Sequence, residues 1–416
     1  MKICFYDSSF PKPYNWNSVS ENPVGGSQLT LLNVAHGLQS LSCDVTICNR
    51  ASTSIVEDVQ YKNISSHSEL IKFTSTQDFD VLVYAGQDRE FASQYLPKTK
   101  SKKRIMWAHN GWHHHACYDN YDAIVCVSNS QRLNYAYLPI FEKTCFIHNG
   151  VNLNHFPESL LNGQKTEKAI FIGSIVPSKG LHHVVRAWPI IKTYVPKAQL
   201  LVAGSAKLYG LDQLGPLGIS TTDYEENYLK PYILSRSGHI RKDIHFLGAV
   251  PHKKLGQLIS SCRVALVNPN WRTSIETCCN SALEAQASGT PVVGVLQGSL
   301  PEVITDQRTG EIVRQPDDAI YAKTVASFLL SSKKSQQFGQ SAREFIVNNF
   351  SLELQSQKWK KFLTAVVDDC VIPNEFKNNW YAEHRLAATA KWAARKSRLG
   401  LVARHTLDSY RKLKVI

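Results

Sequence analysis

The stretch Glu276-Thr-Cys-Cys-Asn-Ser281-Ala-Leu-Glu284-Ala-Gln-Ala-Ser-Gly289-Thr-Pro291-Val-Val293 organises the chain. An apolar strand is expected before it, at residues 264–267, and a second strand after Pro291. Gly289 is expected to end a short helix between them, because glycine adopts the left-handed backbone of a helix C-terminus. The order strand, loop, helix, strand is the one in which α/β proteins bind ligands at the carboxyl ends of strands. The stretch therefore predicts a ligand-binding turn.

The start of this short helix has two interpretations. If Ser281 caps the helix, the backbone N–H groups of residues 280–283 face outward with the positive end of the helix dipole, which is a seat for a diphosphate. Alternatively, Ser281-x-x-Glu284 is a capping box, in which Glu284 only stabilises the helix by about 1 kcal/mol. Glu276 has no capping role. It is either part of the ligand-binding turn or a solvated acid in a loop.

Length and composition limit the class of protein. A chain of 416 residues suits two α/β domains, and 43% hydrophobic with 19% charged residues indicates a globular protein. The N-terminus runs straight into an expected strand without a signal peptide, and no apolar run approaches the ~18 residues of a membrane span. The ten cysteines have no C-x-x-C spacing, so we expect reduced thiols in a cytoplasmic protein.

Apolar strands alternate with helical or irregular segments in the first 150 residues. This alternation predicts a parallel, doubly wound sheet. The strands are expected at residues 2–7, 45–48, 80–84, 104–108 and 123–128. A helix is expected at residues 28–41 with Ser27 as its N-cap, directly after Gly25-Gly26. Paired glycines let the backbone approach a phosphate closely, although they often form only a turn.

Histidines follow the strand at residues 104–108. His109 lies at its carboxyl end, where functional groups collect, and the alternative is a core histidine. His113, His114 and His115 are consecutive, so their side chains diverge on a helix or a strand. No second ligand group has metal-site spacing, and we therefore expect no metal site.

Several of these motifs together resemble the retaining GT-B glycosyltransferases of family 4 (glycosyl transferases group 1). The resemblance covers about residues 1 to 370. It rests on the two glutamates of the 276–293 stretch with Glu-Ala-x-Ala-x-Gly-Thr-Pro-Val-Val, on Gly25-Gly26, on the 173–180 segment that ends in Lys179-Gly180, on Phe246-Leu-Gly-Ala-Val250-Pro251, and on Gly298-Ser-Leu-Pro301-Glu302.

The family implies an α/β fold of the GT-B type, with two Rossmann-like, doubly wound domains that face a central cleft. We expect an acceptor-side domain at residues 1–160 and a nucleotide-sugar-binding domain at 168–345. Residues 346–370 would form a helix that returns to the first domain, and residues 371–416 a basic helical tail.

The resemblance also implies roles for individual residues. Glu284 would bind the ribose, Lys179 and the Gly25-Gly26 backbone the diphosphate, and Glu276 the donor sugar near its reacting carbon. His109 would stand on the opposite side of the cleft. The predicted catalytic residues are thus Glu276, His109 and Lys179, and the predicted donor-binding residues are Gly25, Gly26, Ser174, Lys179, Val250, Thr277, Cys278, Cys279, Asn280, Ser281 and Glu284.

One position departs from the family pattern. Ser174 stands where the family has an arginine that contacts the diphosphate. Loss of a donor that stabilises developing negative charge can cost about 3 kcal/mol. Either Lys179 and helix dipoles suffice, or a nearby cation such as Arg272 replaces the arginine.

By resemblance, the protein is a hexosyltransferase that moves a sugar from a nucleotide-sugar to a hydroxyl acceptor, with retention and without an essential metal ion or other cofactor. A role in surface polysaccharide or glycolipid biosynthesis would fit the family. The alternatives are a sugar-nucleotide epimerase, whose characteristic residues are not evident, and a non-catalytic nucleotide-sugar-binding or scaffold protein. Ser174 motivates the latter, as do Thr277 and Cys279 at positions where the family often has glycine.

The tail and one insertion fall outside these motifs. Residues 385–416 carry nine Lys or Arg and one acid, a net charge of +8 out of +13 for the chain. A basic amphipathic helix there would bind an anionic membrane, which would make the protein peripheral. A solvated helix packed on the body is the alternative, and nucleic acid is not expected because no binding motif accompanies the charge. Residues 205–240 are longer than the family's connection, and either carry specificity or decorate the surface.

Overall fold

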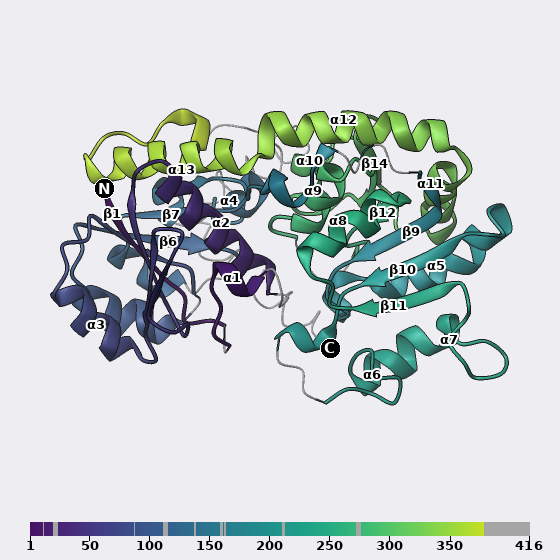
Figure 1. The fold of residues 1–416 in the computed structure, drawn as a ribbon, viewed down its shortest axis with the longest axis horizontal. Helices are drawn as coiled ribbons and strands as arrows, with labels where there is room; N and C mark the ends of the chain where they lie inside the picture. The colour runs from purple at the N-terminus through teal and green to yellow at the C-terminus, as the bar shows by residue number, and fades with distance from the viewer. Residues whose placement is uncertain are drawn as a thin grey trace, which may run out of the picture.

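The chain folds into two α/β domains that lie side by side, as the computed structural model shows (Figure 1). The structure describes residues 1–10, 12–19, 24–86, 88–110, 115–136, 139–158, 161, 164–209, 213–271 and 276–377. Arg272, His113, His114 and the basic segment 385–416 lie outside the described residues, as does the side chain of His115.

The first domain is built on an eight-stranded sheet of order β3-β4-β2-β1-β5-β6-β7-β8. All neighbouring strands are parallel except β3 and β4. The inner strands are buried on both faces, which explains their nearly continuous apolar sequences. The strands are β1 (Lys2–Tyr6), β2 (Asp44–Asn49), β3 (Ser54–Val56), β4 (Val59–Asn63), β5 (Val81–Tyr84), β6 (Lys103–Ala108), β7 (Ala123–Cys126) and β8 (Thr144–Phe146).

Four α-helices cover the described part of this sheet: α1 (Trp16–Val19), α2 (Gly26–Ser40), α3 (His67–Ser75) and α4 (Asn129–Leu133). In α2, the predicted apolar positions Leu31, Val34 and Leu38 are buried. The predicted N-cap Ser27 is wrong, because the helix begins at Gly26 and Gly25 occupies the cap position without a side-chain hydrogen bond. Ser27 therefore lies inside the first turn, two positions after the cap, so its hydroxyl cannot cap the helix.

The second domain is built on a six-stranded, fully parallel sheet of order β11-β10-β9-β12-β13-β14. Its strands are β9 (Thr166–Ile172), β10 (Gln199–Ala203), β11 (Ile244–Gly248), β12 (Cys262–Leu266), β13 (Val292–Val295) and β14 (Gly310–Val313). Its helices are α5 (Leu181–Tyr194), α6 (Thr222–Tyr224), α7 (Lys230–Ile233), α8 (His252–Ser260), α9 (Asn280–Ala287), α10 (Leu300–Val303), α11 (Asp318–Leu330) and α12 (Ser332–Phe350). The two Rossmann-like sheets confirm the predicted fold class.

Short irregular helices join these elements. The 3₁₀ turns are Leu96–Lys98, His115–Asn120, Pro139–Lys143, Leu153–His155, Pro177–Lys179, Ala206–Tyr209 and Asn374–Phe376, and π-helical turns occur at Phe91–Tyr95 and Glu225–Leu229. None of the helices in the described part of the chain is long and apolar enough to cross a membrane.

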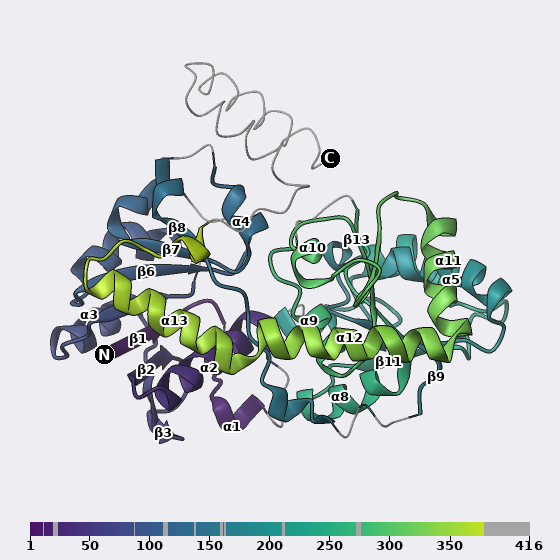
Figure 2. The same cartoon turned by 90° about the horizontal axis from the view of Figure 1, so that it is seen from above.

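The chain returns to the first domain after α12, where α13 (Leu352–Val367) packs against α2 (Figure 2). The break between the two helices is at Ser351, whose hydroxyl accepts from the Leu354 N–H. Beside this break, Val151 donates to Phe350 O at 2.8 Å and accepts from Leu352 N at 2.9 Å. The two crossings between the domains therefore run side by side.

The predicted insertion at residues 205–240 packs, where it is described, against α5. Tyr224 accepts a hydrogen bond from the His182 N–H at 3.1 Å. Buried Glu225 accepts from three backbone amides of residues 217–220, and the Ser220 hydroxyl donates to Ile175 O at 2.6 Å. The insertion thus supports the loop that carries Lys179.

Candidate functional site

A cavity of about 650 Å³ lies between the domains, at the carboxyl ends of β1, β6, β9, β10 and β12. Residues from both domains line it, as a cleft between two doubly wound sheets requires. Every predicted site residue except Gly25 lines this cavity, namely Gly26, His109, Ser174, Lys179, Val250, Glu276, Thr277, Cys278, Cys279, Asn280, Ser281 and Glu284. Gly25 is the adjacent N-cap of α2. The structure therefore brings together residues that are up to 258 positions apart in the chain.

The helix α9 lines this cavity with its first residues and begins two residues earlier than the predicted Ser281 cap implies. Cys279 is its N-cap position and makes no side-chain cap, so the predicted Ser281 cap is wrong. The N–H groups of Asn280, Ala282 and Leu283 donate to the carbonyls of Cys278 and Cys279, so the predicted row of outward-facing amides does not form. These N–H groups therefore form hydrogen bonds within the turn at the start of the helix.

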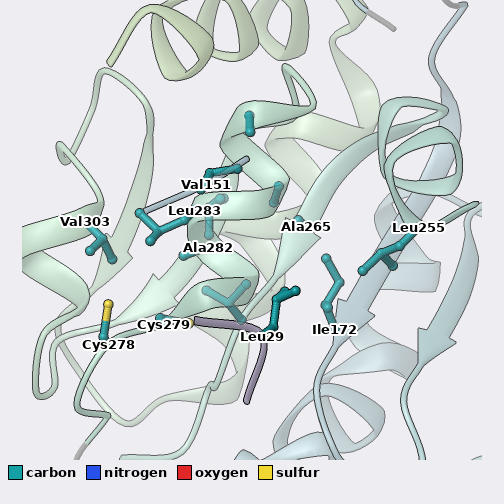
Figure 3. Close-up of a cluster of buried hydrophobic side chains, with 14 of the residues drawn as sticks. Leu29, Val151, Ile172, Leu255, Ala265, Cys278, Cys279, Ala282, Leu283 and Val303 are labelled. Atoms are coloured by element: carbon teal, nitrogen blue, oxygen red, sulfur yellow. The ribbon is translucent and has the colours of Figure 1, made fainter. Parts of the chain in front are cut away.

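The face of α9 that does not line the main cavity is apolar. Figure 3 shows Ala282 and Leu283 among buried side chains that include Leu29 and Val151 of the first domain. Leu283 is 1% exposed. Burial of a leucine contributes about 1.5–3 kcal/mol, so this packing fixes α9 against both domains.

Side chains of the second domain reach across the cleft to the first. Asn280 Nδ2 donates to Gly26 O and Thr30 Oγ1, both at 3.2 Å, and Asn280 Oδ1 accepts from Asn149 Nδ2 at 2.7 Å. A Cβ on Gly26 would lie 3.0 Å from Asn280 Nδ2, which favours glycine there. Thr277 Oγ1 donates to His109 O at 2.7 Å. These bonds join the two domains beside the cavity.

The carboxylate of Glu276 is fixed by two donors. Lys179 Nζ lies 2.9 Å and Asn268 Nδ2 2.5 Å from Glu276 Oε2. The backbone of Glu276 is also held, because its carbonyl accepts from Ser299 N at 2.9 Å. A Cβ on Gly298, which has a φ of +50°, would lie 2.2 Å from that carbonyl oxygen. Glu276 is 6% exposed, so the alternative of a solvated loop acid is wrong.

The carboxyl group of Glu284 has a different environment. It makes no hydrogen bond to another described residue and does not reach back to Ser281, so the capping-box alternative is wrong. A polar neighbour is His252, with Nδ1 3.4 Å from Glu284 Oε1. Burial raises the pKa of Glu284 to about 8 and lowers the pKa of His252 to about 4. Burial therefore favours the neutral form of both groups.

His109 closes the cavity from the first domain. Its ring packs 4.5 Å from that of Trp107, and burial lowers its pKa to about 3. Its Nε2 is buried and has no hydrogen-bond partner among the described residues. The side chain thus packs in the core and also lines the cavity. A core histidine and a histidine at the functional site are therefore compatible interpretations of His109.

The loop that carries Lys179 ends in a left-handed turn. Gly180 has a φ of +76°, and a Cβ there would lie 2.9 Å from Asn270 N. Lys179 is the only lysine or arginine among the described residues that line the cavity. Ser174 is buried beside it and adds no charge. Burial raises the pKa of the Cys278 and Cys279 thiols, which keeps both uncharged.

Sequence reasoning missed Asn268, Asn149 and His252. Asn268 lies two residues after β12 and Asn149 three residues after β8, so both lie at strand ends where functional groups collect. His252 directly follows the motif Phe246-Leu-Gly-Ala-Val250-Pro251. No group of three or more His, Cys, Asp or Glu residues in the described ranges is placed to hold a metal ion.

Comparison with known proteins identifies the second domain. Residues 154–345 match the family model of the glycosyl transferases group 1. This part of the chain belongs to the group 1 glycosyltransferases. The cavity-lining residues of α9 and of the Lys179 loop therefore lie within a glycosyltransferase domain.

Curated relatives match parts of this chain. Spore coat protein SA of Bacillus subtilis is 26% identical over 252 residues, which cover 56% of this chain and 62% of that protein. A D-inositol 3-phosphate glycosyltransferase of Corynebacterium diphtheriae is 34% identical over 134 residues, which cover 32% of this chain and 29% of that protein. The chain thus spans less than two thirds of the length of these relatives.

Solved structures of similar fold span most of the chain. A sucrose-phosphate synthase of Thermosynechococcus elongatus superimposes with a TM-score of 0.68 at 15% identity, over 88% of this chain and 99% of that one. The Anabaena protein Alr3699/HepE in complex with UDP-glucose gives a TM-score of 0.65 at 16% identity, over 88% and 100%. These similarities confirm the GT-B fold of the chain.

Proposed function

We propose that the protein transfers a hexosyl group from a nucleotide-sugar donor to a hydroxyl group of an acceptor. The observation that carries the proposal is the cavity between the domains, in which Lys179, Glu276 and Glu284 meet within a group 1 glycosyltransferase domain. A cation, a fixed carboxylate and an unpartnered carboxyl match the three parts of a donor, which are a diphosphate, a sugar and a ribose.

In this proposal, the nucleotide lies mostly on the second domain. The Lys179 ammonium pairs with the diphosphate, and the Gly26 backbone approaches it from the first domain. Glu284 accepts hydrogen bonds from the ribose hydroxyls, because its carboxyl has no hydrogen-bond partner in the described protein. Val250, just before α8, lies where the base would reach the cavity wall.

The chemical step requires stabilisation of the negative charge that develops on the departing diphosphate. Lys179 supplies this charge, and the carboxylate of Glu276 faces the sugar. The closed cleft excludes water and orients the acceptor, which limits hydrolysis of the donor. We further propose retention of the anomeric configuration and no essential metal ion or other cofactor, as the family resemblance implies. His109 would border the sugar from the first domain.

The relatives suggest classes of donor and acceptor. One solved relative holds UDP-glucose, and several curated relatives carry inositol 3-phosphate in their names. We therefore propose a UDP-hexose as the first donor to test and a carbohydrate or glycolipid as acceptor. A role in surface polysaccharide biosynthesis and a position in the cytoplasm, peripheral to an anionic membrane through residues 385–416, belong to the same proposal.

A second candidate is a non-catalytic nucleotide-sugar-binding protein. Ser174 favours it, since the buried loop beside Lys179 provides no second cation among the described residues. The two candidates differ in whether a bound donor is turned over.

The test is release of nucleoside diphosphate from UDP-, GDP- and ADP-sugars, with membrane-lipid extract as acceptor. We expect release from one donor by the wild type and its loss in Glu276→Ala. Glu353→Ala, at an exposed position of α13, is the control and should retain activity. Donor binding without release would favour the binding protein, and neither binding nor release would contradict both.

Membrane attachment has a separate test. Deletion of residues 385–416 should abolish salt-sensitive sedimentation with anionic vesicles. Unchanged sedimentation of the shortened chain would contradict the peripheral assignment and leave the transferase proposal intact.

A further inference from the structure

His252 is placed at the junction of two parts of the donor cavity. It is the first residue of α8, two positions after Val250, and its side chain is 14% exposed. Glu284 approaches it from α9 with a side chain that is 10% exposed. A small cavity of about 20 Å³ adjoins both residues and is lined also by His155 of the 3₁₀ turn Leu153–His155. His252 therefore touches both the main cavity and the wall behind Glu284.

The Nδ1 atom of His252 is buried and has no hydrogen-bond partner among the described residues. It lies 3.4 Å from Glu284 Oε1, without the geometry of a hydrogen bond. Leaving a buried polar atom unpaired costs on the order of a hydrogen bond, so an unpaired atom beside a cavity favours the binding of a ligand or a water molecule there. An unpaired nitrogen beside an unpaired carboxyl points to a ligand that satisfies both.

A sugar hydroxyl has the required chemistry, since it donates one hydrogen bond and accepts others. An oxygen atom about 2.8 Å from each of two atoms that are 3.4 Å apart fits ordinary hydrogen-bond distances. The hydroxyl would donate to Glu284 and accept from the Nδ1–H of His252. A neutral imidazole suits this arrangement, and burial lowers the pKa of His252 to about 4.

We propose that His252 is a ribose-contacting residue, whose Nδ1–H donates to the hydroxyl that Glu284 holds. The inference rests on the proposed function, because it takes the nucleotide-sugar as the occupant of the cavity. It adds a specificity-determining residue to the site: the pair Glu284 and His252 recognises a hydroxyl that a deoxynucleotide lacks.

The experiment measures nucleotide affinities of the wild type and of variants by calorimetry. UDP, GDP and ADP are tested first, and then the 2′-deoxy and 3′-deoxy forms of the nucleotide that binds most tightly. The variants are His252→Ala, His252→Asn and His252→Gln. In asparagine the amide nitrogen takes the place of Nδ1, whereas in glutamine it takes that of Nε2. The control is His245→Ala, a half-buried histidine of β11 with an unpartnered Nε2 outside the cavity.

We expect His252→Ala to bind the ribonucleotide about 3- to 10-fold more weakly, which is the effect of one hydrogen bond. One of the two deoxynucleotides lacks the hydroxyl that His252 contacts. The wild type and His252→Ala should bind that nucleotide with equal affinity, because the contact is already absent. His252→Asn should bind the ribonucleotide with the affinity of the wild type, whereas His252→Gln should bind it as weakly as His252→Ala. His245→Ala should bind like the wild type.

Two results would overturn the inference. Equal weakening of ribo- and deoxynucleotides in His252→Ala would show a structural role only, and the proposed function would stand. No binding of any nucleotide by the wild type would contradict the proposed function and this inference together. If His252→Ala does not fold, the contrast between His252→Asn and His252→Gln on the same nucleotides decides the question.

Discussion

Two glutamates, eight residues apart, line one cavity in opposite ways. Glu276 lies in a loop, and Lys179 and Asn268 both bond to its carboxylate. Glu284 lies in a helix, its carboxyl group has no hydrogen bond to a described residue, and burial raises its pKa to about 8. The difference separates a group that the protein has already positioned from one that awaits a ligand. We expect the first to serve the chemical step and the second to serve binding.

The sharpest way to break this comparison is to neutralise Glu276. In Glu276→Gln, we expect turnover to fall on the order of 10²-fold, because a charged partner of the transition state is lost. The affinity for nucleoside diphosphate should change by less than about 3-fold, because the proposed contact of Glu276 is to the sugar. The measurements are diphosphate release at saturating donor and calorimetry, with Glu353→Gln as the matched control. Equal losses in binding and turnover would contradict the division of roles.

Removal of the cation is expected to have the next largest effect. In Lys179→Met, nucleoside diphosphate should bind about 10- to 100-fold more weakly, since hydrogen bonds to charged groups contribute about 1.5–3 kcal/mol. The affinity for the corresponding nucleoside, which has no phosphate, should stay unchanged. Lys242→Met, at an exposed position of the same domain, is the control. A similar loss for nucleoside and diphosphate would place Lys179 away from the phosphates.

Glu284 allows a test by pH. Its folded-state pKa of about 8 exceeds the ordinary value of 4.5, so between these pH values the folded protein keeps a proton that the unfolded chain has lost. The contribution of Glu284 to the free energy of unfolding therefore falls as pH rises from about 4.5 to about 8. Glu284→Gln should remove this fall and be more stable than wild type at pH 8.5, by on the order of 1–2 kcal/mol.

The same variant should bind nucleoside diphosphate about 10-fold more weakly, because an amide cannot accept from both ribose hydroxyls. Urea denaturation at pH 5 and pH 8.5 measures the stability, and calorimetry the affinity. A variant whose stability parallels that of wild type at both pH values would mean that Glu284 is ionised, like an ordinary surface acid.

The smallest effect is expected at the neighbour of Glu276. Thr277→Val removes the hydrogen bond to His109 O that joins the domains. We expect the donor KM to rise about 3-fold with little change in kcat, since one neutral hydrogen bond contributes about 1 kcal/mol to closure. Thr193→Val, at an exposed position of α5, is the control. A larger fall in kcat than in affinity would mean that closure positions Glu276 as well.

Much of the fold and of the cavity was predictable, partly from local patterns and partly from the family resemblance. Apolar strands that alternate with helices predicted the first parallel sheet, whereas the second domain and most residues of the cavity followed from the resemblance. The helix starts were wrong at Ser27 and Ser281, because a capping rule selects a side-chain oxygen, whereas here Gly25 and Cys279 begin the helices through their backbones.

What the sequence could not give are contacts between distant segments. Asn280 bonds to Gly26, 254 positions away, and no periodicity couples these positions. The unpaired state of Glu284 was also hidden, because Ser-x-x-Glu reads as a capping box whether or not the serine reaches the cap position. The environment of each carboxylate depends on tertiary packing, while the spacing of the two depends on the motif.

The helix α13 has a consequence for how the protein is made. Trp359, in α13, is fully buried and packs 4.5 Å from Trp107 in the core of the first domain. During synthesis, that core cannot close until residues far beyond its own sheet have left the ribosome. Trp359 comes 213 positions after the end of β8 at Phe146, and the synthesis of this stretch takes about 10–40 s at ~5–20 residues per second. For that time the nascent first domain exposes the apolar surface under α13, and it is the stage at which a chaperone would engage the chain.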